Sequence, residues 1–260
     1  MLFVQSFLNE KLAKFKQSAI LADCELTRKH QTYNSEMLSQ YIAHNLEEQL
    51  NKITEHGFCV MDDFMLQASI LILADEISAL NAVAHLHKAG TGKTQINLNE
   101  DLRGDSICWL NEANASVAQL VYFKQMEKLR VGLNEHLYLG LFALESHLAL
   151  YPIGAGYKKH IDRFKIDTNI RKIDQAVRQV SCILYLNQDW LEEDGGHLRL
   201  YLNQADASLD IPPLPLPDIT YLDIAPIGGR LVMFLSDTFY HEVLAATRNR
   251  ASLTGWFLTR

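Results

Sequence analysis

The chain has 260 residues, of which 48% are hydrophobic and 21% are charged, and its formal net charge is -7. A chain of this length and composition can bury a full core in one large domain or two small ones, which excludes a mainly disordered protein. The acidic balance argues against a general nucleic-acid-binding surface, and no apolar run approaches the roughly 18 residues of a membrane-spanning helix. We therefore expect neither nucleic acid nor a membrane among the partners.

Hydrophobic residues recur at helical spacing in the first half of the chain. Residues 1–50 are predicted to form a helical extension, and an amphipathic helix is predicted over residues 33–53. A short strand is expected over residues 57–61, followed by helices over residues 69–87 and from residue 117 to about 139.

The segment Gly90–Thr94, with the sequence GTGKT, resembles the end of a phosphate-binding P-loop. That loop requires a further glycine at the position that His87 occupies, a strand before it and a helix after it. A predicted helix precedes this segment instead, and a polar stretch follows it. We interpret the segment as a flexible loop and not as a nucleotide site.

From Tyr151 onward the pattern changes to short strands separated by Gly-Gly and Asn/Asp turns, which is typical of an antiparallel sandwich or jelly roll. The strands are expected at residues 181–186, 198–202, 230–235, 240–245 and 251–258. The proline-rich segment 211–217 cannot form a central strand. We expect it to be a stiff surface connection, with the docking of a partner as the alternative.

The four cysteines contain no C-x-x-C pair, which argues against a zinc knuckle or a redox motif. The N-terminal stretch lacks the basic start and the small-residue cleavage site of a signal peptide. Reduced thiols and no export signal together predict a cytoplasmic protein.

His160 and Asp162, with His241 far downstream, are the candidate metal ligands. Residues two apart in a strand point to one face, so we expect His160 and Asp162 to bind one ion together. Two imidazoles and one carboxylate on one face are the ligands of non-heme Fe(II) oxygenases. A zinc hydrolase with the same three ligands is an alternative, as is a jelly-roll binding module without catalysis.

An arginine on the last predicted strand could bind the carboxylate of a cosubstrate, because its planar fork makes two parallel hydrogen bonds. Arg250 and Arg248 are both candidates. Strand alternation places them on the same face, so spacing alone does not choose between them.

These residues belong to a wider pattern, which resembles the prolyl-hydroxylase branch of the 2-oxoglutarate and Fe(II)-dependent oxygenases. It is similar in particular to the hypoxia-sensing prolyl hydroxylases and their bacterial relatives, some of which modify elongation factor Tu. The motifs are Tyr151-Pro152, Gly156-Tyr157, His160-Ile161-Asp162, Leu184-Tyr185-Leu186-Asn187, Asp189-Trp190, Gly195-Gly196, His241-Glu242-Val243, Arg250 and Trp256, with Leu102 to Trp109 upstream.

The resemblance covers about residues 50–260 and implies an α+β fold. That fold is a double-stranded β-helix (jelly roll) core with N-terminal helices packed on it. We expect residues 1–50 to be the N-terminal helical extension and residues 51–260 to be the oxygenase domain. Within this domain, helical support is expected over about residues 65–140 and the jelly roll over about residues 141–260.

Residue by residue, the resemblance implies that His160, Asp162 and His241 bind iron. Arg250, which is followed six residues later by a tryptophan as in the family, corresponds to the arginine that pairs with 2-oxoglutarate. The cosubstrate pocket is completed by Tyr185, Tyr151 and Tyr157. Positions near a protein substrate are Arg178, Trp256, Arg103 and Asp105, although Arg103 and Asp105 could instead pair with each other. The segment from Lys88 to Asp105 corresponds to a finger loop that closes over substrate.

The implied activity is a dioxygenase reaction that uses Fe(II), 2-oxoglutarate and O2, with ascorbate as a further cofactor in some members, and releases succinate and carbon dioxide. The implied partner is a protein with a prolyl residue in an exposed loop, and elongation factor Tu is the leading candidate. A small-molecule hydroxylase is the alternative within the family. The proline-rich loop between residues 202 and 220 departs from the family pattern and leaves the substrate open.

Overall fold

The computed structural model describes residues 47–90, 102–163, 176–202 and 220–260. The described residues from Gln49 onward belong to one compact unit. Residues 47–56 are helical. The rest of the predicted 1–50 extension, the P-loop-like segment after Gly90 and the proline-rich segment all lie outside the described residues. No helix among the described residues is long and apolar enough to cross a membrane.

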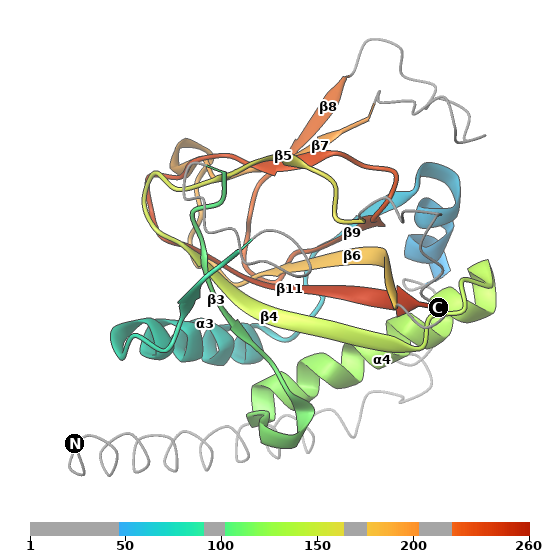
Figure 1. Ribbon diagram of the computed structural model, residues 1–260, viewed down its shortest axis with the longest axis horizontal. Helices are drawn as coiled ribbons and strands as arrows, with labels where there is room; N and C mark the ends of the chain where they lie inside the picture. Colours follow the sequence, from blue (N-terminus) through green and yellow to red (C-terminus); the bar gives the residue numbers. More distant parts are fainter. Residues whose placement is uncertain (1–46, 91–101, 164–175, 203–219) are drawn as a thin grey trace, which may run out of the picture. The chain divides into compact units, whose positions relative to one another are not determined.

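Most strands of the described chain belong to one large antiparallel sheet of seven strands (Figure 1). Their order across the sheet is β1-β9-β6-β11-β4-β3-β2. The three longest, β6, β11 and β4, lie side by side at its centre, with Arg250 of β11 opposite Tyr151 of β4. The strands are β1 (Phe58–Met61), β2 (His87–Lys88), β3 (Ser106–Trp109), β4 (Ala143–Tyr151), β6 (Val177–Tyr185), β9 (Leu231–Leu235) and β11 (Arg250–Thr259).

A smaller antiparallel sheet of four strands, in the order β5-β10-β7-β8, faces the large one. Its strands are β5 (Tyr157–His160), β7 (Leu198–Tyr201), β8 (Tyr221–Ile224) and β10 (His241–Val243). Buried apolar residues of both sheets, such as Ile183 and Phe234 of the large sheet and Leu198 and Leu200 of the small one, pack into one core. Two facing antiparallel sheets are the expected jelly-roll arrangement.

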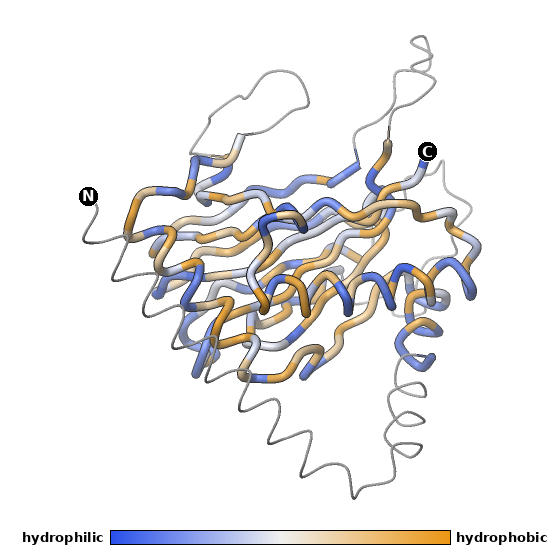
Figure 2. Tube along the Cα trace, turned by 90° about the horizontal axis from the view of Figure 1, so that it is seen from below, coloured by the Kyte–Doolittle hydropathy of each residue, from blue (hydrophilic) through white to orange (hydrophobic). Residues whose placement is uncertain are grey.

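Two helices, α3 (Gln67–Ala82) and α4 (Val117–Leu137), lie along the other side of the large sheet (Figure 1). The sequence starts α4 at Ser116, whose hydroxyl accepts a hydrogen bond from the amide of Gln119 in a capping box. Hydrophobic and polar residues alternate along the helices, as the colours of Figure 2 show. The apolar stripe of α4 is buried, which is what packing against a sheet requires.

The large sheet begins earlier in the chain than the predicted jelly roll. β1, β2 and β3 join it from before residue 141, so the stretch 65–140 contributes strands as well as helices. The helix expected over residues 69–87 ends at Ala82. Ala84 adopts a left-handed backbone conformation with a φ of 54°, which stops the helix and lets His87 pair in β2. Short 3-10 turns at Glu112–Asn114 and Glu192–Asp194 complete the connections.

Candidate active site

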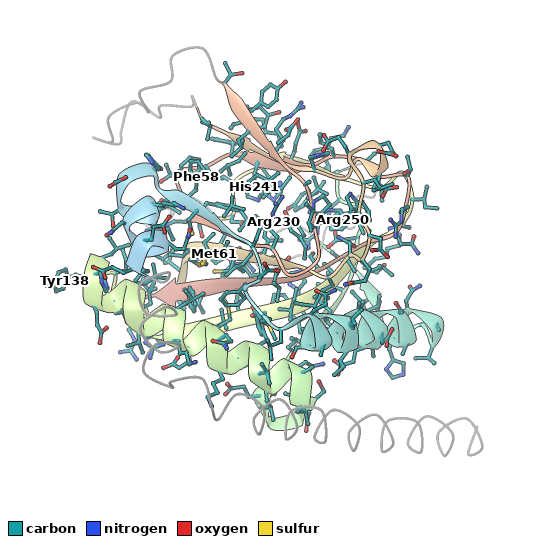
Figure 3. The ribbon with its side chains drawn as sticks, turned by 180° about the vertical axis from the view of Figure 1, so that it is seen from behind. Phe58, Met61, Tyr138, Arg230, His241 and Arg250 are labelled. Atoms are coloured by element: carbon teal, nitrogen blue, oxygen red, sulfur yellow. The ribbon has the colours of Figure 1, made fainter. Side chains whose placement is uncertain are left out.

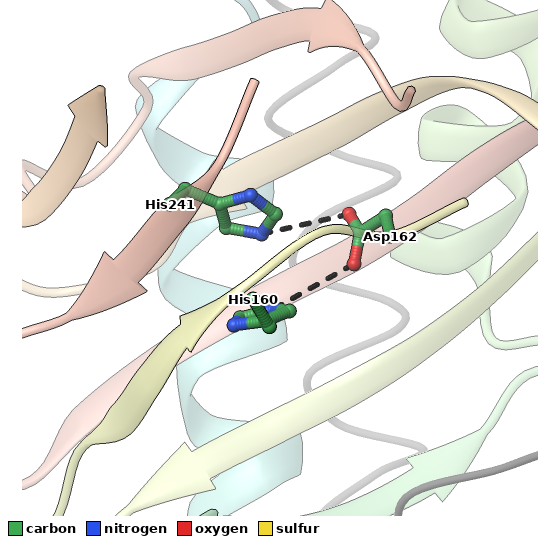
Figure 4. A group of neighbouring side chains, drawn as sticks. All are labelled: His160, Asp162 and His241. Carbon is green, nitrogen blue, oxygen red and sulfur yellow. Dashed lines mark ion pairs between the residues drawn. The ribbon is translucent and has the colours of Figure 1, made fainter. Parts of the chain in front are cut away.

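His160, Asp162 and His241 meet between the two sheets (Figure 4). His160 ends β5 and pairs directly with His241, the first residue of the neighbouring β10. One ligand atom from each of the three residues lies within 4.8 Å of the others. The Nε2 atoms of His160 and His241 are 3.7 and 3.6 Å from the Asp162 carboxylate. These three side chains are therefore close enough to bind one metal ion.

The reason we gave for this convergence is wrong in one detail, because Asp162 is not in a strand. β5 stops at His160, and the chain bends at Asp162. The backbone amide of Arg163 then donates a hydrogen bond to the carbonyl of Ser236, 3.1 Å away, which anchors the bend. The bend, and not strand alternation, brings Asp162 to the metal site.

Each histidine presents Nε2 to the site because Nδ1 is engaged behind it. Nδ1 of His160 lies 2.7 Å from the carbonyl oxygen of Lys158, and Nδ1 of His241 lies 3.2 Å from that of Phe239. A carbonyl oxygen only accepts, so Nδ1 is the nitrogen that donates to it in both rings, and Nε2 is the nitrogen left to face a metal. Tyr157 stacks on His160 with ring centroids 3.5 Å apart, which fixes the plane of that ring.

One oxygen of Asp162 is held by two donors. Its Oδ2 accepts hydrogen bonds from the Ser181 hydroxyl at 2.6 Å and from the Trp256 indole at 2.9 Å. Burial would raise the pKa of Asp162, but the two nearby histidines and these donors lower it to about 2. Burial and the neighbouring His241 lower the pKa of His160 to about 3. At neutral pH the site thus offers a carboxylate and a neutral His160, the states that bind a metal.

A cavity of about 340 Å³ opens beside the three ligands. Arg250 and His241 both point into the interior between the sheets (Figure 3). Arg250 is only 1% exposed, and its Nε donates a hydrogen bond to the carbonyl of Gly196 at 2.8 Å. Its guanidinium carbon lies 5.2 Å from the Tyr151 ring and 5.0 Å from the Tyr185 ring. This part of the cavity therefore has a buried positive charge at its base.

Two buried polar atoms around the Arg250 guanidinium have no hydrogen-bond partner. Nη2 of Arg250 and the hydroxyl of Tyr185 make no hydrogen bond to any described residue. Leaving such atoms unpaired costs free energy, so a ligand that accepts from both is the expected occupant. The distal carboxylate of 2-oxoglutarate has the charge and the two acceptor oxygens that a guanidinium and a phenol together satisfy.

The structure separates the two candidate arginines. Arg248 precedes β11 in a loop and is bound there to the Asp194 carboxylate at 3.0 Å and to the carbonyls of Asp189 and Gln188. Its side chain is 45% exposed. Arg250 lies in the cavity that holds the metal ligands, and Arg248 does not.

Arg103 and Asp105 bind each other through two parallel hydrogen bonds, of 2.6 and 2.9 Å. Asp105 is fully buried, so it orients Arg103 and is not itself exposed to a substrate. Arg103 lies over the Tyr157 ring at 4.8 Å and lines the cavity. Residues 91–101 of the expected finger loop lie outside the described residues.

Arg178 and Trp256 line the same cavity, with Arg178 partly exposed and Trp256 buried. The guanidinium of Arg178 lies 3.5 Å from the centre of the Trp256 ring, and its Nε donates to Glu145 at 2.6 Å. Because Trp256 also donates a hydrogen bond to Asp162, the same indole contacts both Arg178 and a candidate metal ligand.

Sequence reasoning missed Glu145, His147 and Trp109, which also line this cavity. Trp109 is 53% exposed, and its ring is edge-on to His147 at 4.9 Å. Glu145 and His147 could have been found from the sequence. They are an even number of residues from Tyr151 on β4, so they share its face, and Tyr151 was predicted to line the pocket. Trp109 lies within the family motif of residues 102–109, but nothing in that motif marks it as exposed.

The comparisons with known proteins agree with this geometry. Residues 146–258 match the 2OG-Fe(II) oxygenase superfamily. A crystal structure of a prolyl-4-hydroxylase from Pseudomonas putida is 36% identical, covers 83% of this chain and 99% of its own, and superposes with a TM-score of 0.67. A prolyl hydroxylase from Trichoplax adhaerens, solved with a hypoxia inducible factor peptide, shares the fold with a TM-score of 0.69 at 24% identity, over 88% of this chain and 94% of its own.

Among curated proteins, human Egl nine homolog 1 is 28% identical over 213 residues, which is 79% of this chain and 44% of that protein. The rat and mouse proteins of the same name are matched over 56% and 47% of their lengths. The chain thus spans about half the length of the curated relatives it matches.

Proposed function

Because the chain belongs to the 2OG-Fe(II) oxygenase superfamily, we propose that it is an Fe(II)- and 2-oxoglutarate-dependent dioxygenase that hydroxylates a prolyl residue of a protein. The observation that carries this proposal is the cavity that brings the His160–Asp162–His241 triad together with the buried Arg250. The similarity to the Pseudomonas putida prolyl-4-hydroxylase supports prolyl hydroxylation as the reaction.

The residues of this chain bind, orient and shield the reactants. The triad would hold the metal through its two imidazoles and one carboxylate. Arg250 and Tyr185 would bind the distal carboxylate of 2-oxoglutarate. When bound, the metal and cosubstrate supply the oxidising chemistry that side chains lack; the reaction consumes O2 and yields succinate and carbon dioxide. The buried walls of the cavity keep water away from the reacting groups.

A zinc hydrolase would use the same triad but would leave the buried Arg250 and Tyr185 without a ligand. Those two unpartnered groups favour the oxygenase. A small-molecule hydroxylase remains the second candidate within the family. The mouth of the cavity favours a protein substrate, because Trp109 and Arg178 there are partly exposed and extend the site beyond the metal.

We place the activity in the cytoplasm, and we take elongation factor Tu as the leading substrate candidate. The described cysteines, Cys59, Cys108 and Cys182, are free thiols, in keeping with a reducing compartment. The candidate substrate rests on the resemblance to bacterial prolyl hydroxylases.

The test is hydroxylation of defined substrates by purified protein with Fe(II), 2-oxoglutarate and ascorbate. Peptides from exposed prolyl loops, including those of elongation factor Tu, are compared with free proline. We expect succinate formation together with a mass gain of one oxygen atom on a prolyl residue, and neither product from a His160→Ala variant. Hydroxylation of free proline but of no peptide would favour the small-molecule enzyme, and turnover without 2-oxoglutarate would contradict the proposal.

A further inference from the structure

Glu145 and Arg178 form an ion pair at the mouth of the active-site cavity. Glu145 lies on β4 directly opposite Trp256, and Arg178 lies on β6 opposite Leu258, so the two side chains flank β11. The Nε of Arg178 donates to Oε1 of Glu145 at 2.6 Å. Both side chains line the cavity and both remain accessible, with 36% of Glu145 and 27% of Arg178 exposed.

Each of the two side chains makes one hydrogen bond within the pair and has further polar atoms that remain available. Within the described part of the chain, Oε2 of Glu145 accepts no hydrogen bond, and neither Nη group of Arg178 has an acceptor. Trp256 lies under the guanidinium at 3.5 Å and fixes its plane. The mouth of the cavity therefore presents a fixed acceptor beside a fixed pair of donors. The two opposite charges largely cancel, so the pair does not strongly select an isolated anion or cation.

The peptide group has the complementary arrangement, with an N–H that donates and a C=O that accepts. We propose that the Glu145–Arg178 pair binds the main chain of the substrate next to the target proline, with Oε2 accepting an N–H and Nη donating to a C=O. Main-chain hydrogen bonds are a common source of affinity for extended peptides. The exposed indole of Trp109, on the strand beside β4, offers an apolar surface for the side chains that flank these groups.

This inference rests on the proposed function and makes its substrate class definite. Proline itself has no N–H, so the donor must belong to a neighbouring residue. Recognition by the main chain depends little on which side chains surround the proline. The enzyme would therefore accept an extended prolyl segment of varied sequence and discriminate against free proline.

The experiment is an N-methyl scan of a prolyl peptide that the enzyme hydroxylates. Each N–H within two residues of the proline is replaced by N–CH3 in turn, and the dissociation constant and the KM are measured for the wild type and for Glu145→Ala. Glu127→Ala is the matched control, because Glu127 forms a similar ion pair with Arg130 on the surface of α4, outside the cavity.

We expect one N-methyl position to weaken binding by about tenfold or more in the wild type and in the control, since a hydrogen bond to a charged group is lost. In Glu145→Ala the same methyl group should have little further effect. The loss should appear in KM and not in kcat, because the contact is made equally in the ground state and the transition state.

Two results would overturn the inference. In the first, the wild type hydroxylates the unmodified peptide but no N-methyl position weakens binding. The main-chain contact is then absent, while the proposed function stands. Equal sensitivity in the wild type and in Glu145→Ala assigns the contact to another residue. A different result would contradict the proposed function itself: the enzyme would hydroxylate no prolyl peptide at all.

Discussion

Two buried polar atoms without hydrogen-bond partners, Nη2 of Arg250 and the hydroxyl of Tyr185, are the clearest evidence for a ligand in this protein. Both groups lie in a site from which water is largely excluded. Strand spacing alone left Arg248 and Arg250 equivalent, and the family resemblance favoured Arg250. Burial separates them, because the Arg248 side chain is bound to Asp194 outside the cavity. Binding of 2-oxoglutarate should therefore depend on one of the two arginines.

We predict that Arg250→Lys weakens 2-oxoglutarate binding by at least about tenfold, because an ammonium group cannot reproduce the two parallel hydrogen bonds of a guanidinium. Arg248→Lys should change the affinity little. Both dissociation constants can be measured by calorimetry under anaerobic conditions with Fe(II) present. Equal losses in the two variants would show that the cosubstrate does not bind at Arg250.

A second prediction at the residue scale concerns His147 and the way the stability of the protein depends on pH. Burial, with the nearby Arg103 and Arg178, lowers its pKa from 6.5 to about 3. Between those two pH values the unfolded chain binds a proton that the folded chain refuses, so this group lowers stability as the pH falls below about 6.5. This one group changes the free energy of unfolding by at most about 1.4 kcal/mol per pH unit.

The variant His147→Met fills a similar volume without a titrating group. Metal-free protein with this substitution should lose stability less steeply between pH 6.5 and about 4 than the wild type does. Urea unfolding at a series of pH values measures the two slopes. Parallel slopes would mean that His147 is protonated in the folded protein.

At the scale of elements, helix α4 approaches the large sheet closely at Gly255. Gly255 of β11 lies beneath the hydroxyls of Tyr122 from α4 and Ser146 from β4, which hydrogen-bond to each other at 3.1 Å. A Cβ on Gly255 would lie 2.5 Å from the Ser146 oxygen and 2.9 Å from that of Tyr122. The absence of a side chain there lets the helix approach the strands that carry Trp256 and Glu145.

Gly255→Ala should destabilise the protein by about 1–3 kcal/mol, because the added methyl group overpacks this contact. In a Ser146→Ala background the additional loss should be smaller, since the nearest atom has been removed. Urea denaturation of the wild type, the two single variants and the double variant gives the coupling free energy between the two positions. An equal loss in both backgrounds would show that the methyl group is accommodated elsewhere.

The elements also show where prediction from sequence stops. Strands with strong apolar patterns, such as β6 and β11, are found close to their predicted positions. β2 and β3 were not predicted because both are short, and because β2 begins at the end of a helical pattern while β3 follows a polar stretch. Asp162 lies beside His160 and His241 as expected, but the strand that was expected to place it ends two residues before it. A bend of this kind depends on a distant hydrogen bond to Ser236, which local patterns do not contain.

At the scale of the whole described unit, the site exists because two sheets meet. The small sheet supplies His160 and His241, and the large sheet supplies Arg250, Trp256, Glu145 and Arg178. A family resemblance could identify most of these residues, since each lies in a recognisable motif. It could not identify the Glu145–Arg178 pair, because that pair is formed between two strands far apart in the sequence.

The central claim is that the triad and Arg250 form one site, in which 2-oxoglutarate is bound by the metal and by the guanidinium together. Anaerobic calorimetric titration of 2-oxoglutarate, with and without Fe(II), into the wild type and Asp162→Ala tests it most directly. The account predicts tight binding to the wild type only when the metal is present, and no metal-dependent gain in the variant. Binding that is unchanged by removing the metal or the Asp162 carboxylate would contradict it.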